Sequence, residues 1–576
     1  MRSRVRANSV SSVMRGTTVA ALLVPWIAAC ERGPAVDAQS VVLVTLDTTR
    51  ADALTAFGGT RGVAPVLDAL ASESVLFTNA HTVAPLTLPA HASMLTGFYP
   101  PRHGVRGNGP ARLTAEADTL AERATRAGFE TAAFVGSLAL DRDYGIGQGY
   151  ATWGQPESND ERVVGQISDR TAGEVLLEAR AWLAQRDRRR PFFLWVHLFD
   201  PHAPYAAAPE FLARAGDHPY YAEVASMDSE LGSFFEDLRA EGFLDAGHLL
   251  VVGDHGEGLD EHGEDTHGQH LWESTLRVPM FLRLPSAQRA GEVRAEFTSV
   301  VDVAPTLAEA MGLPPLVGID GASLVGELSS VRGTYFEALS GWVRFRWSPM
   351  CGWIGPEGKY VHSSQPRLWS LVGDEQRDAS SAHPATVERA KRAIRAVLDA
   401  PALHHGNHIA SAGAGAAIEA LGYSSGGEFE PDYPDLLAPS DLPSPDARID
   451  EYRHFSAAQA LAATGRHAEA AERLEALLRE NPQSVSALDE LARSLLALGR
   501  WQRAAEVLLE RRKHRPERLA TEQGLVQCYT ELGDAPRAKE HTLHALEMLV
   551  EIHAQRGEAG EAARYRELLE QGRADR

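Results

Sequence analysis

The chain contains 576 residues, more than one compact core normally holds, so we expect two or more domains. Hydrophobic residues make up 44% of the chain and charged residues 23%, which excludes a disordered protein and a multi-spanning membrane protein. A net charge of −22 excludes a general affinity for nucleic acid, so no nucleic-acid partner is expected.

The first segment, residues 1–30, has the pattern of an export signal. Arginines such as Arg2 and Arg4 precede an apolar run at 17–27 that is too short to cross a bilayer comfortably. The run ends in I-A-A-C at 27–30, which resembles the lipobox of bacterial lipoproteins. We therefore expect an exported bacterial protein in the cell envelope or periplasm, anchored to the membrane by a lipid on Cys30. An ordinary signal peptide and an uncleaved anchor are the alternatives.

Residues 31–400 alternate short apolar runs with amphipathic stretches, the pattern of an α/β sheet covered by helices. The runs at 41–46, 192–196 and 249–252 are apolar enough to be strands buried on both faces. Each run is followed by side chains that can do chemistry, and active sites of open α/β sheets lie beyond the carboxyl ends of the strands. These side chains are Asp47, then His197, Asp200 and His202, then Asp254 and His255.

The C-terminal part has a different pattern. Residues 401–447 are rich in glycine and then in proline, which predicts a linker that separates two cores. Within residues 448–576, Gly465, Gly499 and Gly533 recur every 34 residues. This period, with glycine at the turn between helices, resembles the tetratricopeptide repeat and predicts an all-α domain. Such arrays usually bind proteins, so we expect a protein partner there, with a purely structural cap as the alternative.

Three motifs carry a family resemblance. They are V-T-L-D-T-T-R-A-D at 44–52, T-L-P-A-H-A-S-M-L-T-G-F-Y-P-P-R-H-G at 87–104 and G-D-H-G-E at 253–257. Together they resemble the sulfatases of the alkaline phosphatase superfamily, over residues 41 to about 375. The resemblance implies an alkaline-phosphatase/sulfatase-like sheet flanked by helices.

The chemistry that these motifs favour is metal-assisted attack by a hydroxyl group. A threonine hydroxyl is a weak nucleophile, and a bound metal ion can activate it. Asp47, Asp254 and His255 offer two carboxylates and one imidazole, with room for Thr87 as the nucleophile and further metal ligand. We expect one divalent ion, Mn²⁺ or Zn²⁺, with Ca²⁺ as the alternative, because one carboxylate of the family's set is missing and an imidazole is present.

Three further residues follow from the resemblance alone. His202 matches the family histidine that contacts the transferring group, and His267 matches a histidine of phosphoethanolamine transferases. Either histidine could protonate the leaving oxygen. Asn108 resembles an amide that phosphodiesterases point at a phosphoryl oxygen. Asp200 with His202 and His267 is the alternative arrangement for a second metal ion.

Thr87 stands where sulfatases carry the Cys or Ser that becomes formylglycine, and threonine cannot form that aldehyde. The family's sulfate-binding lysines have no counterpart, since no lysine precedes Lys359. We therefore expect a hydrolase or transferase that cleaves phosphate-type esters, either phosphodiesters or phospho-head-groups, of a small or lipid-linked substrate. A sulfatase that uses unmodified threonine and an inactive scaffold that binds partners through its repeats are the alternatives.

Overall fold

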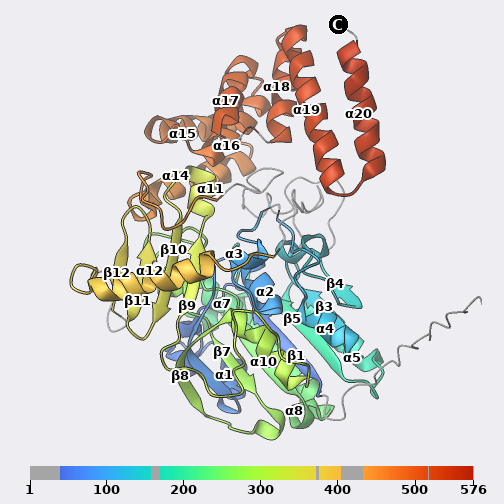
Figure 1. The fold of residues 1–576 in the computed structure, drawn as a ribbon, viewed down its shortest axis with the longest axis vertical. Helices are drawn as coiled ribbons and strands as arrows, with labels where there is room; N and C mark the ends of the chain where they lie inside the picture. Colours follow the sequence, from blue (N-terminus) through green and yellow to red (C-terminus); the bar gives the residue numbers. More distant parts are fainter. Residues whose placement is uncertain are drawn as a thin grey trace, which may run out of the picture.

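The computed structural model describes residues 39–109, 111–156, 169–370, 375, 377–403, 433–514, 516 and 518–574. The expected signal with Cys30 and most of the expected linker therefore lie outside the described residues. In the described part, no helix is both long and apolar enough to span a membrane. Cys351 and Cys528 are buried free thiols. An α/β part with two sheets lies below an array of helices in Figure 1.

The main sheet has eight strands in the order β4-β3-β5-β1-β6-β7-β2-β8, most of them parallel to their neighbours. β7 is antiparallel to both β6 and β2. The strands are β1 (Val41–Leu46), β2 (Val75–His81), β3 (Glu130–Val135), β4 (Thr152–Gly154), β5 (Phe192–Leu198), β6 (His248–Gly253), β7 (Met280–Arg283) and β8 (Val293–Ser299).

Strand β1 lies at the centre of this sheet and decides where the site is. It pairs in parallel with β5 and β6, so that Leu46 is level with Leu198 and with Gly253. All six of its residues are buried, and they alternate between the hydrophobic clusters on the two faces of the sheet. Asp47 and Asp254, which directly follow β1 and β6, therefore emerge at the same edge.

Helices cover both faces of the main sheet. The cluster on one face includes α1 (Pro65–Ser72), α5 (Ala172–Gln185), α7 (Pro219–Ala240) and α8 (Phe243–Ala246). The cluster on the other face includes α2 (Thr87–Thr96), α4 (Leu120–Arg126) and α10 (Val303–Ala310). Short helices α3 (Pro100–His103), α6 (Pro209–Arg214) and α9 (Glu273–Leu276) lie in the connections. The expected α/β fold is confirmed.

A smaller antiparallel sheet follows, in the order β12-β11-β10-β9. Helix α12 crosses this sheet in Figure 1. It contributes Ala390 and Ile394 to the hydrophobic cluster that also includes α2, α4 and α10. Its elements are β9 (Thr334–Ala338), α11 (Ser340–Phe345), β10 (Met350–Gly355), β11 (Gly358–His362), β12 (Arg367–Trp369) and α12 (Pro384–Leu398).

The C-terminal helices form the expected repeat array, in which each helix packs against the next. Gly465, Gly499 and Gly533 have φ angles of 78°, 66° and 73°, which end one helix and let the chain reverse into its partner. The helices are α14 (Ile449–Ala463), α15 (His467–Glu480), α16 (Val485–Ala497), α17 (Trp501–His514), α18 (Leu519–Glu531), α19 (Ala535–Gln555) and α20 (Ala559–Ala574).

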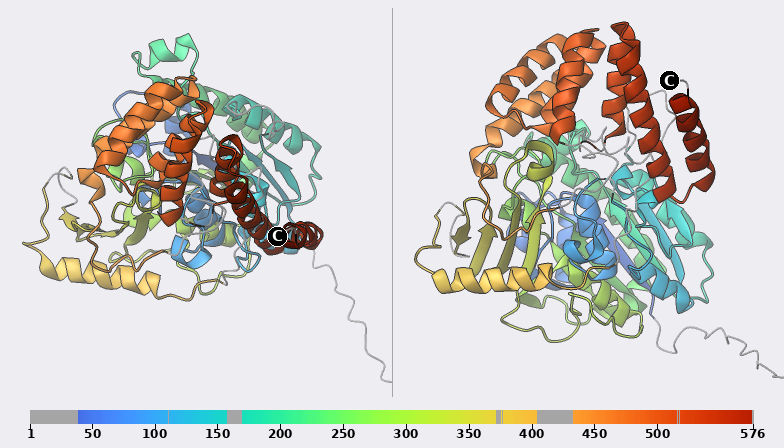
Figure 2. Two further views of the ribbon diagram at one scale, coloured as in Figure 1. Left: turned by 90° about the horizontal axis from the view of Figure 1, so that it is seen from above. Right: turned by 45° about the horizontal axis from the view of Figure 1, so that its top comes forward.

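The expectation that the linker separates the two cores is wrong in one respect, because the first repeat helices pack on the catalytic part. Phe345 and Trp347 belong to the same hydrophobic cluster as the repeats. The Trp347 indole donates a hydrogen bond of 2.9 Å to Glu451, and the Asn481 side-chain amide donates one of 2.8 Å to the Phe345 carbonyl. Seen from above, the array arches over the α/β part (Figure 2).

Candidate active site

Two carboxylates and one histidine meet where β1 and β6 end. Candidate ligand atoms of Asp47, Asp254 and His255 all lie within 4.8 Å of one another, and the three side chains are fully buried. Asp47 Oδ1, Asp254 Oδ2 and His255 Nε2 are buried atoms without a hydrogen-bond partner. A protein normally satisfies such atoms, so three orphaned atoms facing one another indicate a binding site.

The backbone orients two of these three groups. Asp254 Oδ1 accepts hydrogen bonds from the amides of Thr48 at 3.2 Å and His255 at 2.7 Å, which leaves Oδ2 unpaired. His255 Nδ1 lies 3.0 Å from the Gly256 carbonyl and must donate to it. His255 Nε2 then keeps its lone pair, the form in which an imidazole binds a metal.

The carboxyl groups of Asp47 and Asp254 lie in a buried environment that disfavours their negative charge. Burial raises the pKa of Asp47 well above its usual value, and the carboxylates of Glu257 and Asp169 raise it further. Burial and the neighbouring Asp47 likewise raise the pKa of Asp254, while burial lowers the pKa of His255. Two carboxyl groups this close in a dry site either hold a proton or are balanced by a cation, so the cluster favours a bound cation when both are ionised.

The donor set fits a divalent ion. His255 Nε2 lies 3.6 Å from Asp254 Oδ2 and 3.9 Å from Asp47 Oδ1. Two ligands that share one ion at about 2.1 Å are roughly 3–3.5 Å apart, so a small inward movement closes the set. Two carboxylates and a neutral imidazole are also the protonation states that metal binding requires.

Thr87 is the first residue of α2, and it lies beside this cluster. Its side chain is 1% exposed, and its hydroxyl makes no hydrogen bond of ordinary length and angle. The hydroxyl is nevertheless close enough to Asp47 to interact with that carboxylate and to lower its pKa, which partly offsets the effect of burial. The amino end of a helix carries partial positive charge, so an anionic ester is favoured at this position.

Asn108 lies at the same end of α2. Its side-chain carbonyl accepts a hydrogen bond of 3.0 Å from the amide of Leu88, the residue after Thr87. This contact leaves the Asn108 amide group as a buried donor without a partner. The side chain is therefore fixed by its oxygen and offers two N–H groups beside Thr87, the expected nucleophile.

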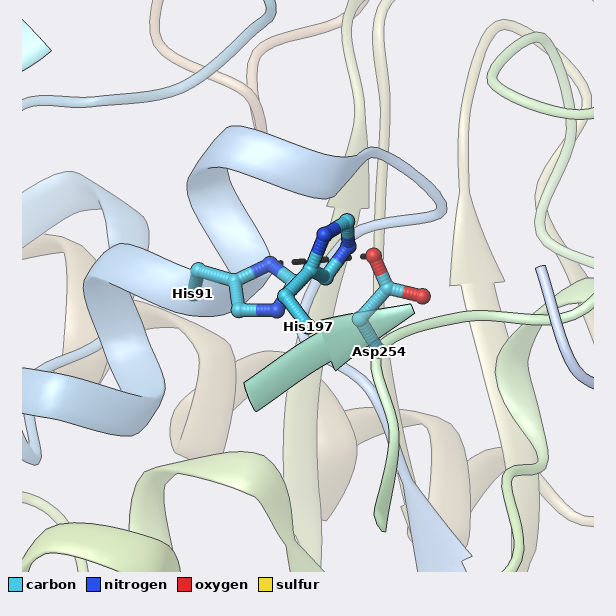
Figure 3. A group of neighbouring side chains, drawn as sticks. All are labelled: His91, His197 and Asp254. Carbon is cyan, nitrogen blue, oxygen red and sulfur yellow. Dashed lines mark ion pairs between the residues drawn. The ribbon is translucent and has the colours of Figure 1, made fainter. Parts of the chain in front are cut away.

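Two more histidines contact the cluster. His197 was expected among the side chains at the strand ends but was given no role, and His91 was not predicted as a site residue. Figure 3 shows His91 of α2, His197 of β5 and Asp254 pointing toward one another. His197 Nε2 donates to Asp47 Oδ2 at 3.1 Å. His91 Nδ1 donates to the Thr87 carbonyl at 2.8 Å and lies 3.7 Å from Asp254 Oδ2.

These two histidines orient the site and are poor metal ligands, because their ring nitrogens already have partners. The second nitrogen of His91 is 3.0 Å from the Thr45 hydroxyl, and that of His197 is 3.4 Å from the Gly136 amide. Burial lowers the pKa of His197 to about 3, so its ring is neutral. The sequence signals for them were the position of His91 one helical turn after Thr87 and of His197 near the end of β5.

His202 and His267 lie on another side of His255. The His267 ring is 4.4 Å from the His255 ring and 5.2 Å from the His202 ring, measured between centroids. His267 Nδ1 is 3.1 Å from Glu257 Oε1, and His202 Nδ1 is 2.6 Å from the Ala203 carbonyl. The carboxylate of Glu257 thus orients His267, a role that the sequence did not reveal.

Asp200, His202 and His267, the residues considered for a second metal ion, do not form a cluster with metal-ligand spacing. Among the described residues, the clusters with metal-ligand spacing are the two around Asp254 and one in the repeats, of Glu522, His541 and His544. Asp200 belongs to none of them. Burial raises the pKa of Asp200 to about 7, as it does for a carboxyl group held in an apolar environment.

With this geometry in view, the chain was compared with known proteins. Residues 39–313 match the sequence model of the family described as sulfatase. This α/β domain belongs to the sulfatase family. Residues 461–520 match the tetratricopeptide repeat, which confirms the prediction from the 34-residue period.

Curated proteins that are similar to this chain are named as sulfatases. The ulvan-active sulfatase of Formosa agariphila is 26% identical over 50% of this chain and 64% of that protein. The choline-sulfatase of Rhizobium meliloti is 25% identical over 54% of this chain and 76% of that protein. Each alignment thus covers about half of this chain, and the first covers less than two thirds of the relative's own length.

Solved structures share the fold. The phosphonate monoester hydrolase of Agrobacterium radiobacter aligns with a TM-score of 0.51 and 21% identity, over 62% of this chain and 95% of that chain. A protein solved with its substrate D-glucosamine-2-N,6-O-disulfate aligns with a TM-score of 0.54 and 17% identity, over 62% of this chain and 97% of that chain. These similarities support the sulfatase fold of the α/β part.

Proposed function

We propose that the protein is a metal-dependent sulfatase-family hydrolase or transferase that cleaves phosphate-type esters with Thr87 as an unmodified nucleophile. The observation that carries the proposal is the buried Thr87 hydroxyl, which lies at a helix amino end, close to the Asp47 carboxylate and beside three orphaned ligand atoms. A hydroxyl in this position is what a nucleophile needs, because its oxygen can face both the substrate and a cation.

Asp47, Asp254 and His255 would hold one divalent ion, for which Mn²⁺ or Zn²⁺ is proposed and Ca²⁺ is the alternative. The ion would supply Lewis acidity that favours the ionised hydroxyl and balances charge on the ester oxygens. The chain's own groups do the rest. The amino end of α2 and the Asn108 amide receive the anionic group, and the buried surroundings exclude water.

The proton balance assigns a role to the histidines. The Thr87 hydroxyl loses a proton as its oxygen bonds to phosphorus, and the leaving oxygen gains one as its bond breaks. His267, oriented by Glu257, is the group best placed to exchange protons with the leaving oxygen and later with the incoming water or alcohol. His202 lies beside it and is the second candidate.

The charge around the site favours esters that carry a single negative charge. The charges that act most strongly on Asp47 are the carboxylates of Glu257 and Asp169. Lys359 is buried in ion pairs with Glu273 at 3.0 Å and Glu375 at 2.5 Å, so these two carboxylates already balance its positive charge. Phosphodiesters fit such a site better than the dianions of phosphate monoesters, which need more fixed positive charge.

Cleavage of sulfate esters by unmodified threonine is the second candidate, because the curated relatives are named as sulfatases. One experiment separates the two. Purified protein loaded with Mn²⁺, Zn²⁺ or Ca²⁺ is offered 4-nitrophenyl esters of phosphodiester, phosphonate, phosphate and sulfate type. Fastest turnover of the diester supports the proposal, and fastest turnover of the sulfate ester replaces it with the alternative.

The setting of the enzyme is also a proposal. The I-A-A-C motif at 27–30 supports lipid anchoring at Cys30 in the cell envelope, which would place a lipid-linked ester within reach. The repeat array supports a protein partner. Metabolic labelling with a fatty acid, compared between the natural chain and Cys30→Ser, tests the anchor.

A further inference from the structure

The active-site loop, residues 257–270, connects the catalytic residues to the repeats. It folds back on itself through backbone hydrogen bonds from Gly258 to Thr266 at 2.7 Å and from Leu259 to Asp265 at 3.2 Å. Glu257 begins the loop and His267 follows its far arm, so the hairpin brings these two side chains to 3.1 Å. The place of His267 therefore depends on the shape of the loop.

The outer face of this loop is held by α14, the first helix of the repeat array. The Tyr452 hydroxyl lies 2.9 Å from the Thr266 hydroxyl, one residue before His267. Arg453 forms an ion pair with Asp260 and lies 3.8 Å from Asp265, on the opposite arm. Tyr452 and Arg453 thus hold both arms of the hairpin against α14.

The fit between loop and helix is also steric. Gly263, at the tip of the loop, has a φ of 86°, and a Cβ atom there would lie 3.2 Å from the Ile449 side chain. A side chain at this position would press on α14, and the positive φ also favours glycine, so the loop packs closely against the helix. His270, at the end of the loop, lies 3.8 Å from Asp446, just before α14.

Helix α14 can serve as a fixed support because it is anchored independently of the loop. Glu451 accepts hydrogen bonds from Trp347 at 2.9 Å and from Asn481 at 2.7 Å. The Tyr452 ring meets the edge of the Phe345 ring at 6.2 Å between centroids. These neighbours belong to α11, to the connection between α11 and β10, and to the end of α15, so α14 is held from two sides.

We infer that Tyr452 is a positioning residue for His267, and that the first repeat helix is therefore part of the catalytic unit. The inference deepens the proposed function and rests on it for the role of His267. Tyr452 touches no reacting atom in this arrangement. It fixes Thr266, and Thr266 fixes the backbone that carries His267.

The test is a double-mutant cycle of Tyr452→Phe and Thr266→Val in the full-length protein. Both changes keep the shape of the side chain and remove one hydroxyl of the pair. If His267 exchanges a proton with the leaving oxygen, each variant should lower kcat/KM about tenfold for a phenyl ester and less than about twofold for the 4-nitrophenyl ester, which needs no proton. The double variant should fall no further than either single one.

Two matched controls belong to this cycle. Thr464→Val removes a hydroxyl at the far end of the same helix, where it bonds to the carbonyls of Ala460 and Leu461, and it should leave both rates unchanged. Thr266→Ser keeps a hydroxyl and should restore the phenyl-ester rate. Equal losses with both leaving groups, or additive losses in the double variant, would show a general structural effect and overturn the inference.

A second measurement separates failure of this inference from failure of the proposed function. Hydrogen–deuterium exchange of residues 257–270 needs no substrate, and it should accelerate in Tyr452→Phe and stay unchanged in Thr464→Val. Unchanged exchange in Tyr452→Phe overturns the support by α14 whatever the enzyme cleaves. Accelerated exchange with no loss on phenyl esters would keep the support and remove His267 from the chemistry.

Discussion

His197 Nε2 lies 3.1 Å from Asp47 Oδ2, and this contact leaves Asp47 Oδ1 as the oxygen that faces His255. Because the carboxylate is held by one oxygen, its other oxygen is presented in a fixed direction. The same logic applies to Asp254, whose Oδ1 accepts two backbone amides. The metal cluster thus owes its geometry to groups that do not belong to it.

Replacing His197 should therefore weaken metal binding without removing a ligand. We expect His197→Gln to raise the Kd for Mn²⁺ or Zn²⁺ by about 10- to 100-fold, as loss of a group that orients a ligand typically does. His248→Gln is the matched control, because His248 begins β6 at the opposite edge of the sheet. Competition with a chelating dye measures both affinities, and equal affinities in the two variants would remove His197 from the site.

Replacing Asp47 itself should separate metal binding from stability. Burial disfavours the charged form of Asp47, so the neutral Asp47→Asn variant should unfold at a higher temperature than metal-free natural protein. The same variant should lose its metal, because one of three ligands is gone. Elemental analysis and calorimetry measure the two effects. Unchanged metal content would contradict the assignment of Asp47 as a ligand.

The activity of Thr87 variants should depend on whether the new side chain carries a hydroxyl group. Thr87→Ala should lower kcat by at least about 10³-fold, since removal of a nucleophile leaves only binding and electrostatic effects. Thr87→Ser should keep part of the activity, because a serine hydroxyl can occupy the same position at the start of α2. Metal content should stay unchanged or fall slightly in both variants. An active Thr87→Ala protein would place the nucleophile elsewhere.

The buried carboxyl group of Asp200 should make the stability of the folded protein depend on pH. Burial raises its pKa to about 7 in the folded protein, above the value of 3.8 for an exposed aspartate. The folded state therefore holds a proton that the unfolded state releases, and this contribution to stability is lost as pH rises from about 4 to about 7.

Asp200→Asn should consequently stabilise the protein by about 1–2 kcal/mol at pH 8 and by nearly nothing at pH 4. Asp399→Asn, at an exposed position with 64% of the side chain accessible, is the control and should show no such difference. Chemical denaturation at the two pH values measures the effect. The same gain at both pH values would mean that desolvation of Asp200 is not its origin.

Part of the candidate site could be predicted because some of its residues occupy positions that are recognisable in the local sequence. Asp47 and Asp254 directly follow strands, and the strand-end rule needs no knowledge of distant contacts. The supporting residues follow a different logic. His197 precedes the end of β5, and only the register of β1 with β5 reveals that its ring reaches Asp47. His91 follows Thr87 by four residues, and its bond to the Thr87 carbonyl depends on the helix that forms there.

The packing of the repeats on the catalytic part could not be predicted by the same rules. Composition between residues 401 and 447 indicates a loose connection, but it carries no information about what the two flanking domains touch. The contact is made by Trp347 and Glu451, which are 104 residues apart in the chain. Each looks ordinary alone, one as a core tryptophan and the other as a helix glutamate. Only the assembled fold shows that they meet.

Trapping the covalent intermediate tests the central claim most directly. The protein is mixed with a fast phosphodiester substrate, quenched in acid within the first turnovers, digested and analysed by mass spectrometry. The account predicts a phosphate-ester adduct on Thr87, with unmodified threonine there in the absence of substrate. An adduct on a different residue, or turnover with no adduct on any peptide under conditions that preserve phosphothreonine, would contradict it.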